Sequence, residues 1–175
     1  MIKTRKSIFE TNSSSTHSIV IAGGNVSSKL PEELEFNAGE FGWQWEIYND
    51  VQSRADYLYT SIVYCGLVDE LIPILTETLE SWGVTPHFEE LVKKECSYPS
   101  KEHYYYDFKD TFGYVDHGHQ NEDFVREVCN DETLLLNYLF GSDSYIATGN
   151  DNEDDNYESE LPNPTDVLKT YYKGN

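Results

Sequence analysis

Residues 9–18 hold the side chains best suited to chemistry, in the run Phe-Glu-Thr-Asn-Ser-Ser-Ser-Thr-His-Ser. Histidine suits proton transfer near neutral pH, and a cluster of hydroxyls can position a phosphate or another polar substrate. Ser15, Thr16 and His17 are therefore candidate catalytic residues. The alternative is a turn whose hydroxyls bond to their own backbone, and composition alone favours that alternative.

A second candidate is the segment Asp116, His117, Gly118 and His119. Asp116 and His117 could complete a catalytic group with His17, the carboxylate fixing the tautomer of an imidazole. Two imidazoles and a carboxylate can also bind zinc or another divalent metal, so Asp116, His117 and His119 are candidate ligands of one divalent ion. A single His-x-His pair has low specificity, and an exposed turn at Gly118 explains it as well.

A third candidate is Asp151, in the segment Gly-Asn-Asp-Asn at 149–152. A carboxylate at a strand end can point into a site, although composition favours a simple turn. All three segments flank predicted strands, so we expect them to converge on one site. In particular, His17 and Asp116 should lie within a hydrogen bond or one water molecule of each other.

The chain is strongly acidic, with 32 Asp and Glu against 12 Lys and Arg, and a net charge of -20. Such a chain repels phosphate backbones, so we expect no direct binding to free duplex DNA. Acidity is spread along the sequence and is densest at 151–160, a solvated acidic loop or a strip that binds a basic partner. The candidate partner-binding residues in this strip are Asp151, Glu153, Asp154, Asp155, Glu158 and Glu160.

Neither a membrane span nor a secretory signal is expected. The sequence has no apolar run of about 18 residues, and its first ten residues lack an apolar segment. The three cysteines have no metal-knuckle or disulfide spacing, which predicts reduced thiols. These features together predict a cytoplasmic protein.

Hydrophobic patterning predicts a single α+β domain over residues 1–175, with a central, mostly antiparallel sheet and several short helices. The fallback is an α/β fold. The first helix is expected to begin near a cap at Asn49 or Asp50, and the second to end at Gly83 with Pro73 in its first turn. The predicted strands are 17–22, 104–108, 114–115 and 144–148, and the predicted helices are 55–67, 71–82, 122–129 and 132–140.

The run at 9–18 resembles an N-terminal signature of small proteins from phages, plasmids and other mobile elements of Gram-positive bacteria. Some acidic proteins of that origin are anti-CRISPR inhibitors, one group of which is associated with guide-RNA truncation. The resemblance implies an anti-defence protein whose suspected partner is an RNA-guided Cas nuclease.

Two functions from different classes are consistent with these features, and an ordinary stress or regulatory accessory protein is a third. The first is an acidic inhibitor that engages a basic nucleic-acid-binding host protein. The alternative is a nuclease-like phosphodiester hydrolase that acts, through the His/Asp site, on RNA presented by such a partner.

Overall fold

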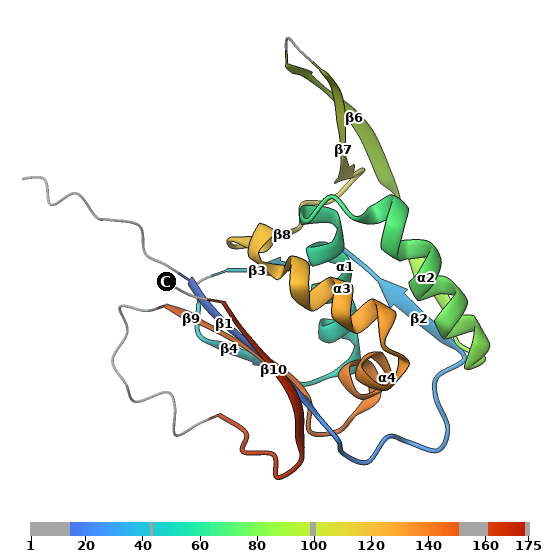
Figure 1. Ribbon diagram of the computed structural model, residues 1–175, viewed down its shortest axis with the longest axis vertical. Helices are drawn as coiled ribbons and strands as arrows, with labels where there is room; N and C mark the ends of the chain where they lie inside the picture. The colour runs from blue at the N-terminus through green and yellow to red at the C-terminus, as the bar shows by residue number, and fades with distance from the viewer. Residues whose placement is uncertain (1–14, 43, 99–100, 151–160, 174–175) are drawn as a thin grey trace, which may run out of the picture.

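A computed structural model describes residues 15–42, 44–98, 101–150 and 161–173, in which four α-helices lie on one side of a four-stranded sheet (Figure 1). The strand order is β10-β1-β9-β4, and every neighbouring pair is antiparallel. The α+β prediction is therefore confirmed. The strands are β1 (Ser15–Ala22), β4 (Glu46–Tyr48), β9 (Tyr145–Asn150) and β10 (Val167–Lys173).

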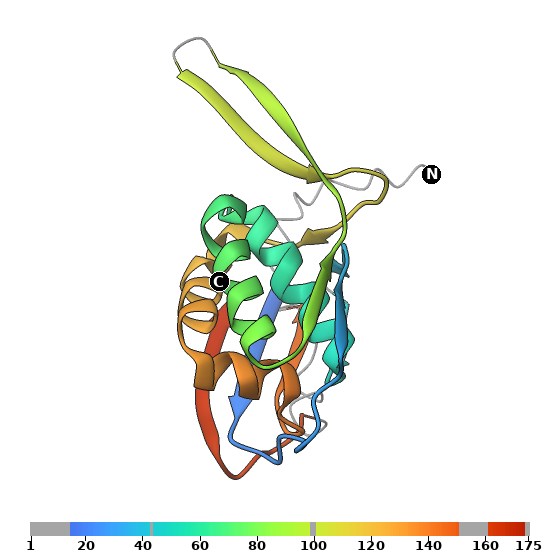
Figure 2. The same cartoon turned by 90° about the vertical axis from the view of Figure 1, so that its right-hand side faces the viewer.

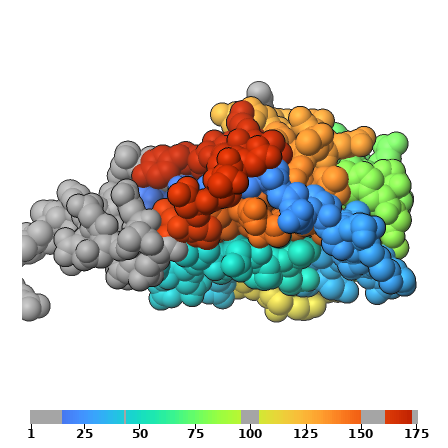
Figure 3. Space-filling view, turned by 90° about the horizontal axis from the view of Figure 1, so that it is seen from below, coloured from blue at the N-terminus to red at the C-terminus, as the bar shows by residue number. Residues whose placement is uncertain are grey.

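Strand β1 lies inside the sheet because both of its edges are paired, one with β9 and the other with β10. His17, Ile19 and Ile21 are buried, and the two isoleucines belong to the main core. Successive side chains of a strand point to opposite faces, so the same alternation brings His17 to the core face. In the space-filling view from below, the red C-terminal segment lies directly against blue residues of the N-terminal region (Figure 3).

The helices begin and end at recognisable signals. Asp50 caps the first helix by accepting a hydrogen bond from the Ser53 amide, as its position predicted. Gly66 and Gly83 follow the first two helices with φ of 69° and 78°, the left-handed region that favours glycine. The placement of Pro73 in a first turn is wrong, because α2 already begins at Val68. The helices are α1 (Val51–Tyr64), α2 (Val68–Ser81), α3 (Glu122–Asn130) and α4 (Glu132–Phe140).

The buried guanidinium of Arg54 joins helix α1 to the turn between α4 and β9. It donates to the carbonyl oxygens of Leu139, Gly141 and Ser144 at 2.6–2.9 Å. Burial lowers the pKa of Arg54, and the carbonyl dipoles stabilise its two terminal nitrogens, while Nε has no hydrogen-bond partner among the described residues. The turn after α4 is thereby held at a fixed place beside the sheet.

Two pairs of short strands complete the layer beside α1. Strand β2 (Glu33–Phe36) is parallel to β5 (Thr85–Phe88), and β3 (Glu40–Phe41) is parallel to β8 (Tyr114–Val115). Only β8 was predicted from the sequence. The others are too short to show a hydrophobic period, so their formation depends on packing against α1 and α2.

Strands β6 (Leu91–Tyr98) and β7 (Lys101–Phe108) form an antiparallel hairpin that projects from the body like an arm (Figures 1 and 2). At its base, the Tyr106 hydroxyl donates to the Asp69 carboxylate at 2.6 Å. The Lys93 ammonium lies 3.2 Å from the centre of the Tyr104 ring. The bond from Tyr106 to Asp69 anchors the arm to the start of α2, whereas the contact of Lys93 with Tyr104 joins the two strands of the arm. No helix within the described ranges is long and apolar enough to cross a bilayer.

Candidate functional site

His17 lies in the protein core with none of its surface exposed. Its Nδ1 is 2.9 Å from the Tyr57 hydroxyl, and its Nε2 is 3.0 Å from the Gly42 carbonyl oxygen. Strand β1 supplies the histidine, and helix α1 supplies the tyrosine. The ring therefore links the sheet to the helix layer and to the chain that follows β3.

The partners of His17 fix its tautomer. A carbonyl oxygen only accepts, so Nε2 carries the proton and Nδ1 of the neutral ring accepts from Tyr57. The Tyr57 oxygen accepts in turn from Asn121 Nδ2 at 3.0 Å, and Asn121 also donates to Ser61 Oγ at 3.0 Å. Burial raises the pKa of Tyr57, which keeps the phenol protonated and able to donate.

This arrangement makes His17 a structural residue in the described conformation. A general base needs a ring nitrogen within hydrogen-bond reach of the substrate. Both nitrogens of His17 instead bind groups of the protein, inside a network that satisfies its members. The sequence did not point to Tyr57 or Asn121, because each lies within or beside a helix and neither belongs to a catalytic motif.

The hydroxyl residues before His17 are also part of the sheet. Ser15 is buried and pairs with Asn150, while Thr16 pairs with Gly149. Strand pairing therefore brings these two segments side by side. The turn expected at 149–152 is wrong for Gly149 and Asn150, which belong to β9. Asp151 lies outside the described residues.

Close packing, rather than a turn, explains the glycine at position 149. A Cβ there would lie 3.3 Å from Trp45 Cε3 and 3.4 Å from Thr16 Oγ1. The absent side chain thus leaves room for the indole and the hydroxyl on this face of the sheet.

The second predicted segment forms a turn that leads into a short 3₁₀ helix, Gly118–Asn121. His117 adopts a left-handed conformation with φ of 51°, and its Nε2 is 3.9 Å from Asp116 Oδ1. The rings of His117 and His119 are 6.3 Å apart. Within the described parts of the chain, no three His, Cys, Asp or Glu side chains gather closely enough to bind a metal ion. The geometry gives no support to a metal site at Asp116, His117 and His119.

Asp116 and His17 bind neighbouring backbone carbonyls at the end of β3, but they do not bind each other. The Asp116 amide donates to the Phe41 carbonyl at 2.9 Å, whereas His17 donates to the carbonyl of the next residue, Gly42. The side chain of Asp116 faces His117 instead. The expected direct hydrogen bond between His17 and Asp116 is absent from the contacts of the described residues.

Gly42 also lines a surface cavity of about 200 Å³. Its walls include the carboxylates of Glu40 and Glu46 and the phenols of Tyr48 and Tyr114. The Tyr48 hydroxyl donates to Glu46, and burial together with this carboxylate raises the pKa of Tyr48. The cavity is therefore acidic, and it repels a phosphate rather than binding one.

The acidic side chains cover several outer faces of the fold. On β2, Glu33 and Glu35 point to solvent, and Leu34 and Phe36 are buried. Helix α2 repeats this division, with buried leucines and exposed acids. The exposed acids without a basic side chain at ion-pair distance, within the described ranges, include Glu32, Glu35, Glu40, Glu46, Asp50, Asp69, Glu77, Glu80, Asp123, Asp131, Glu132, Asp143 and Asp166.

Several of the described basic side chains already bind acids. Lys109 pairs with Glu90 at 2.7 Å, Lys169 pairs with Glu127 at 2.8 Å, and Arg126 binds carboxylates of α2 and α3. The unpaired surface charge is therefore predominantly negative. The predicted strip Asp151, Glu153, Asp154, Asp155, Glu158 and Glu160 lies outside the described residues.

Comparison with known proteins gives no relative from which a function could be transferred: no family model, curated protein or solved structure matches the chain. The functional argument therefore depends on the surface, the cavities and the buried network of this chain alone.

Proposed function

We propose that this protein is an acidic inhibitor that binds the nucleic-acid-binding face of a basic partner in the host cytoplasm. The observation that carries this proposal is the predominance of exposed acids without basic partners across β2, α2 and the turn after α4. Opposite charge accelerates the encounter with a basic channel, and the bound inhibitor would exclude DNA or RNA from it.

The class of partner follows from the charge and from the resemblance at 9–18. A basic channel that holds nucleic acid is the natural complement of a surface with net charge -20. The mobile-element signature suggests a host-defence protein, and an RNA-guided Cas nuclease is our proposed partner. Guide-strand or target-strand channels both have the required charge.

The hydrolase alternative receives less support from the geometry. His17 is enclosed with both ring nitrogens hydrogen-bonded, and its contacts do not include Asp116. The His-x-His segment forms a turn in which the two rings are 6.3 Å apart. Neither arrangement presents a free imidazole beside a carboxylate to a substrate.

The test uses a purified Cas nuclease loaded with guide RNA, its DNA target and this protein. We expect direct binding that weakens strongly with added salt, loss of target cleavage, and guide RNA of unchanged length on a denaturing gel, with or without chelator. Shortened guide RNA would favour the hydrolase. Tight, salt-insensitive binding to naked duplex DNA would contradict the charge argument.

Matched variants separate the acidic surface from nonspecific effects. The change of Glu32, Glu35, Glu77 and Glu80 to glutamine should slow association and flatten its salt dependence, because these acids are exposed and unpaired. Replacement of Asp154, Asp155, Glu158 and Glu160 by Asn or Gln tests the strip in the same way. Inhibition that survives both sets of changes unaltered would exclude an electrostatic mechanism.

A further inference from the structure

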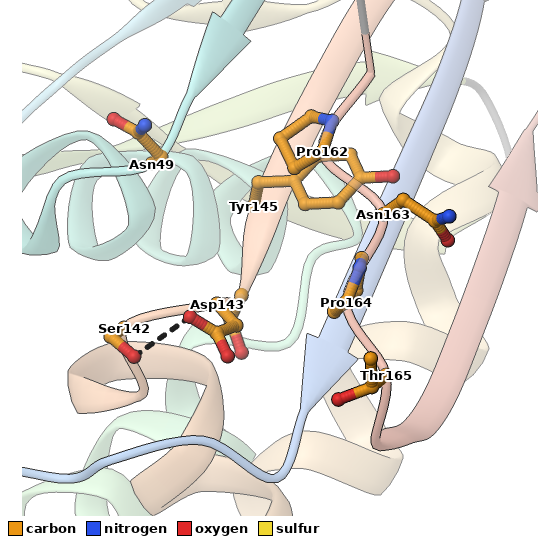
Figure 4. A pocket seen from close by; sticks show the side chains of 9 residues that line it. Asn49, Ser142, Asp143, Tyr145, Pro162, Asn163, Pro164 and Thr165 are labelled. Atoms are coloured by element: carbon orange, nitrogen blue, oxygen red, sulfur yellow. Dashed lines mark hydrogen bonds between the residues drawn. The ribbon is translucent and has the colours of Figure 1, made fainter.

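A second cavity, of about 320 Å³, lies between the turn after α4 and the segment that leads to β10 (Figure 4). Ser142, Asp143 and Tyr145 come from the turn and from the start of β9. The other wall comes from residues 162–165, with Asn49 at the end of β4 completing it. The volume falls within the range of small-ligand sites, near its lower end.

Tyr145 supplies a polar group that a ligand in this cavity could bind. The residue is only 5% exposed, and its ring packs with Val20 and Ala147. Its hydroxyl, however, has no hydrogen-bond partner among the described residues, and in Figure 4 it points toward the segment with Pro162 and Asn163. This hydroxyl is not among the fully buried polar atoms that lack a partner, so it opens to the cavity and is available to a ligand that binds there.

The charge of the cavity limits the ligand to a cation or a neutral molecule. Asp143 is the only charged side chain in the lining. It accepts a hydrogen bond from Ser142 Oγ at 2.9 Å, and no described basic side chain pairs with it. The side-chain amides of Asn49 and Asn163 and the hydroxyl of Thr165 add further acceptor oxygens. The lining thus favours a positively charged ligand that donates several hydrogen bonds.

The shape of the lining favours a planar cation over a compact ammonium. Pro162 and Pro164 present apolar rings beside the phenol of Tyr145 (Figure 4). A guanidinium is planar, donates five N–H bonds and is less strongly hydrated than an ammonium, so it can lie against such surfaces while it binds a carboxylate.

We propose that this cavity binds the guanidinium of an arginine side chain of the basic partner, with Asp143 accepting its hydrogen bonds and the Tyr145 hydroxyl contacting it. The inference rests on the proposed function for the source of the arginine. The guanidinium chemistry comes from the cavity itself. Arginine is enriched at the centres of protein interfaces and in nucleic-acid-binding channels, so one such side chain would anchor the acidic surface.

The first test is an NMR titration of the full chain with N-acetylarginine amide, its neutral citrulline counterpart and its lysine counterpart. We expect saturable shifts of the backbone amides at 142–145 with the arginine probe, and binding about tenfold weaker with the other two. Equal binding of arginine and citrulline, equal binding of arginine and lysine, or no saturable shift would each overturn the guanidinium site.

Two variants and a matched control locate the contact. Asp143→Asn should weaken the arginine probe about tenfold, and Tyr145→Phe should weaken it by about threefold, because charged and neutral hydrogen bonds differ in strength. Asp110→Asn removes the same charge from an exposed turn outside the cavity and should leave probe affinity unchanged. Equal loss in Asp143→Asn and Asp110→Asn would indicate general electrostatics and overturn the site.

A third measurement separates this site from the proposed function. Asp143→Asn should weaken binding to the guide-loaded nuclease. Its NMR spectrum should remain that of the folded wild-type protein away from the cavity. If the arginine probe binds but nuclease affinity is the same in wild type and Asp143→Asn, the inhibitor proposal survives and the arginine source is wrong. If the probe binds and no nuclease binds at all, the inhibitor proposal fails, and with it the partner arginine.

Discussion

Tyr57 and Tyr145 are both buried tyrosines, and they differ in what their hydroxyls bind. The Tyr57 hydroxyl contacts His17 and Asn121 within a closed network in the core. The Tyr145 hydroxyl, on the opposite face of the sheet, borders a cavity and has no partner among the described residues. A buried group whose hydrogen-bond partners all come from the protein indicates a structural role, whereas a hydroxyl that opens to a cavity without a protein partner is available to a ligand.

The comparison bears on the catalytic role that the sequence suggested for His17, which stays a prediction. A histidine that follows a run of hydroxyls has the composition of a catalytic loop, yet here the histidine helps to hold the fold. The cavity beside Tyr145 has no recognisable motif, yet it offers an unpaired carboxylate and an available hydroxyl. Residue type alone therefore does not distinguish structural polar groups from functional ones; their hydrogen-bond partners do.

The largest effect is expected for His17→Ala. This change removes a buried ring and leaves the Tyr57 hydroxyl and the Gly42 carbonyl without their partner. We expect a loss of roughly 2–4 kcal/mol in the free energy of unfolding, from the cavity and the unsatisfied groups together. Urea denaturation measures it. A variant of unchanged stability that loses RNA cleavage would reverse the comparison and restore the catalytic role of His17.

Tyr57→Phe should have a smaller effect of the same kind. It deletes one hydroxyl, so His17 Nδ1 and one Asn121 N–H lose a partner while the ring packing remains. We expect a loss of about 1–3 kcal/mol by urea denaturation. In a double-mutant cycle with Asn121→Ala, the two changes should be less than additive by at least about 0.5 kcal/mol. Full additivity would show that the network is not a unit.

The stability of the protein at alkaline pH gives a third test of the network around Tyr57. Burial raises the pKa of Tyr57, so the unfolded chain releases the phenol proton near pH ~10 while the folded protein retains it. Stability contributed by this group is therefore complete below pH ~10 and falls as the pH rises beyond it, by up to about 1.4 kcal/mol per pH unit. Urea midpoints between pH 8 and 11 should fall less steeply in Tyr57→Phe than in wild type. Parallel curves would contradict this assignment.

The elements that the sequence predicted are those with strong local signals. Strand β1 has a β-branched apolar run followed by Gly23 and Gly24, α1 has the Asp50 cap, and α4 ends at Gly141. The parallel pairs β2–β5 and β3–β8 and the strands β4, β6 and β10 were not predicted. Strands of two to four residues carry too little pattern, and tertiary packing decides whether they form.

The position of His17 could have been predicted from strand alternation. Ser15, His17, Ile19 and Ile21 share one face of β1, and the two isoleucines show that this face enters the core. The cavity beside Tyr145 could not be predicted. It is formed by residues 142–145 and 162–165, which are far apart in the sequence. They lie together because β9 and β10 pair with opposite edges of β1.

Of these changes, Tyr145→Phe should alter the free energy of unfolding least. The ring stays packed against Val20 and Ala147, and the deleted hydroxyl has no described partner to leave unsatisfied. The free energy of unfolding should therefore change by no more than about 0.5 kcal/mol, against the larger loss in Tyr57→Phe. Parallel urea denaturation of the two variants makes the comparison direct, since each loses one phenolic oxygen from a buried ring. A loss above about 1 kcal/mol in Tyr145→Phe would show that this hydroxyl supports the fold, and its proposed availability to a ligand would then be wrong.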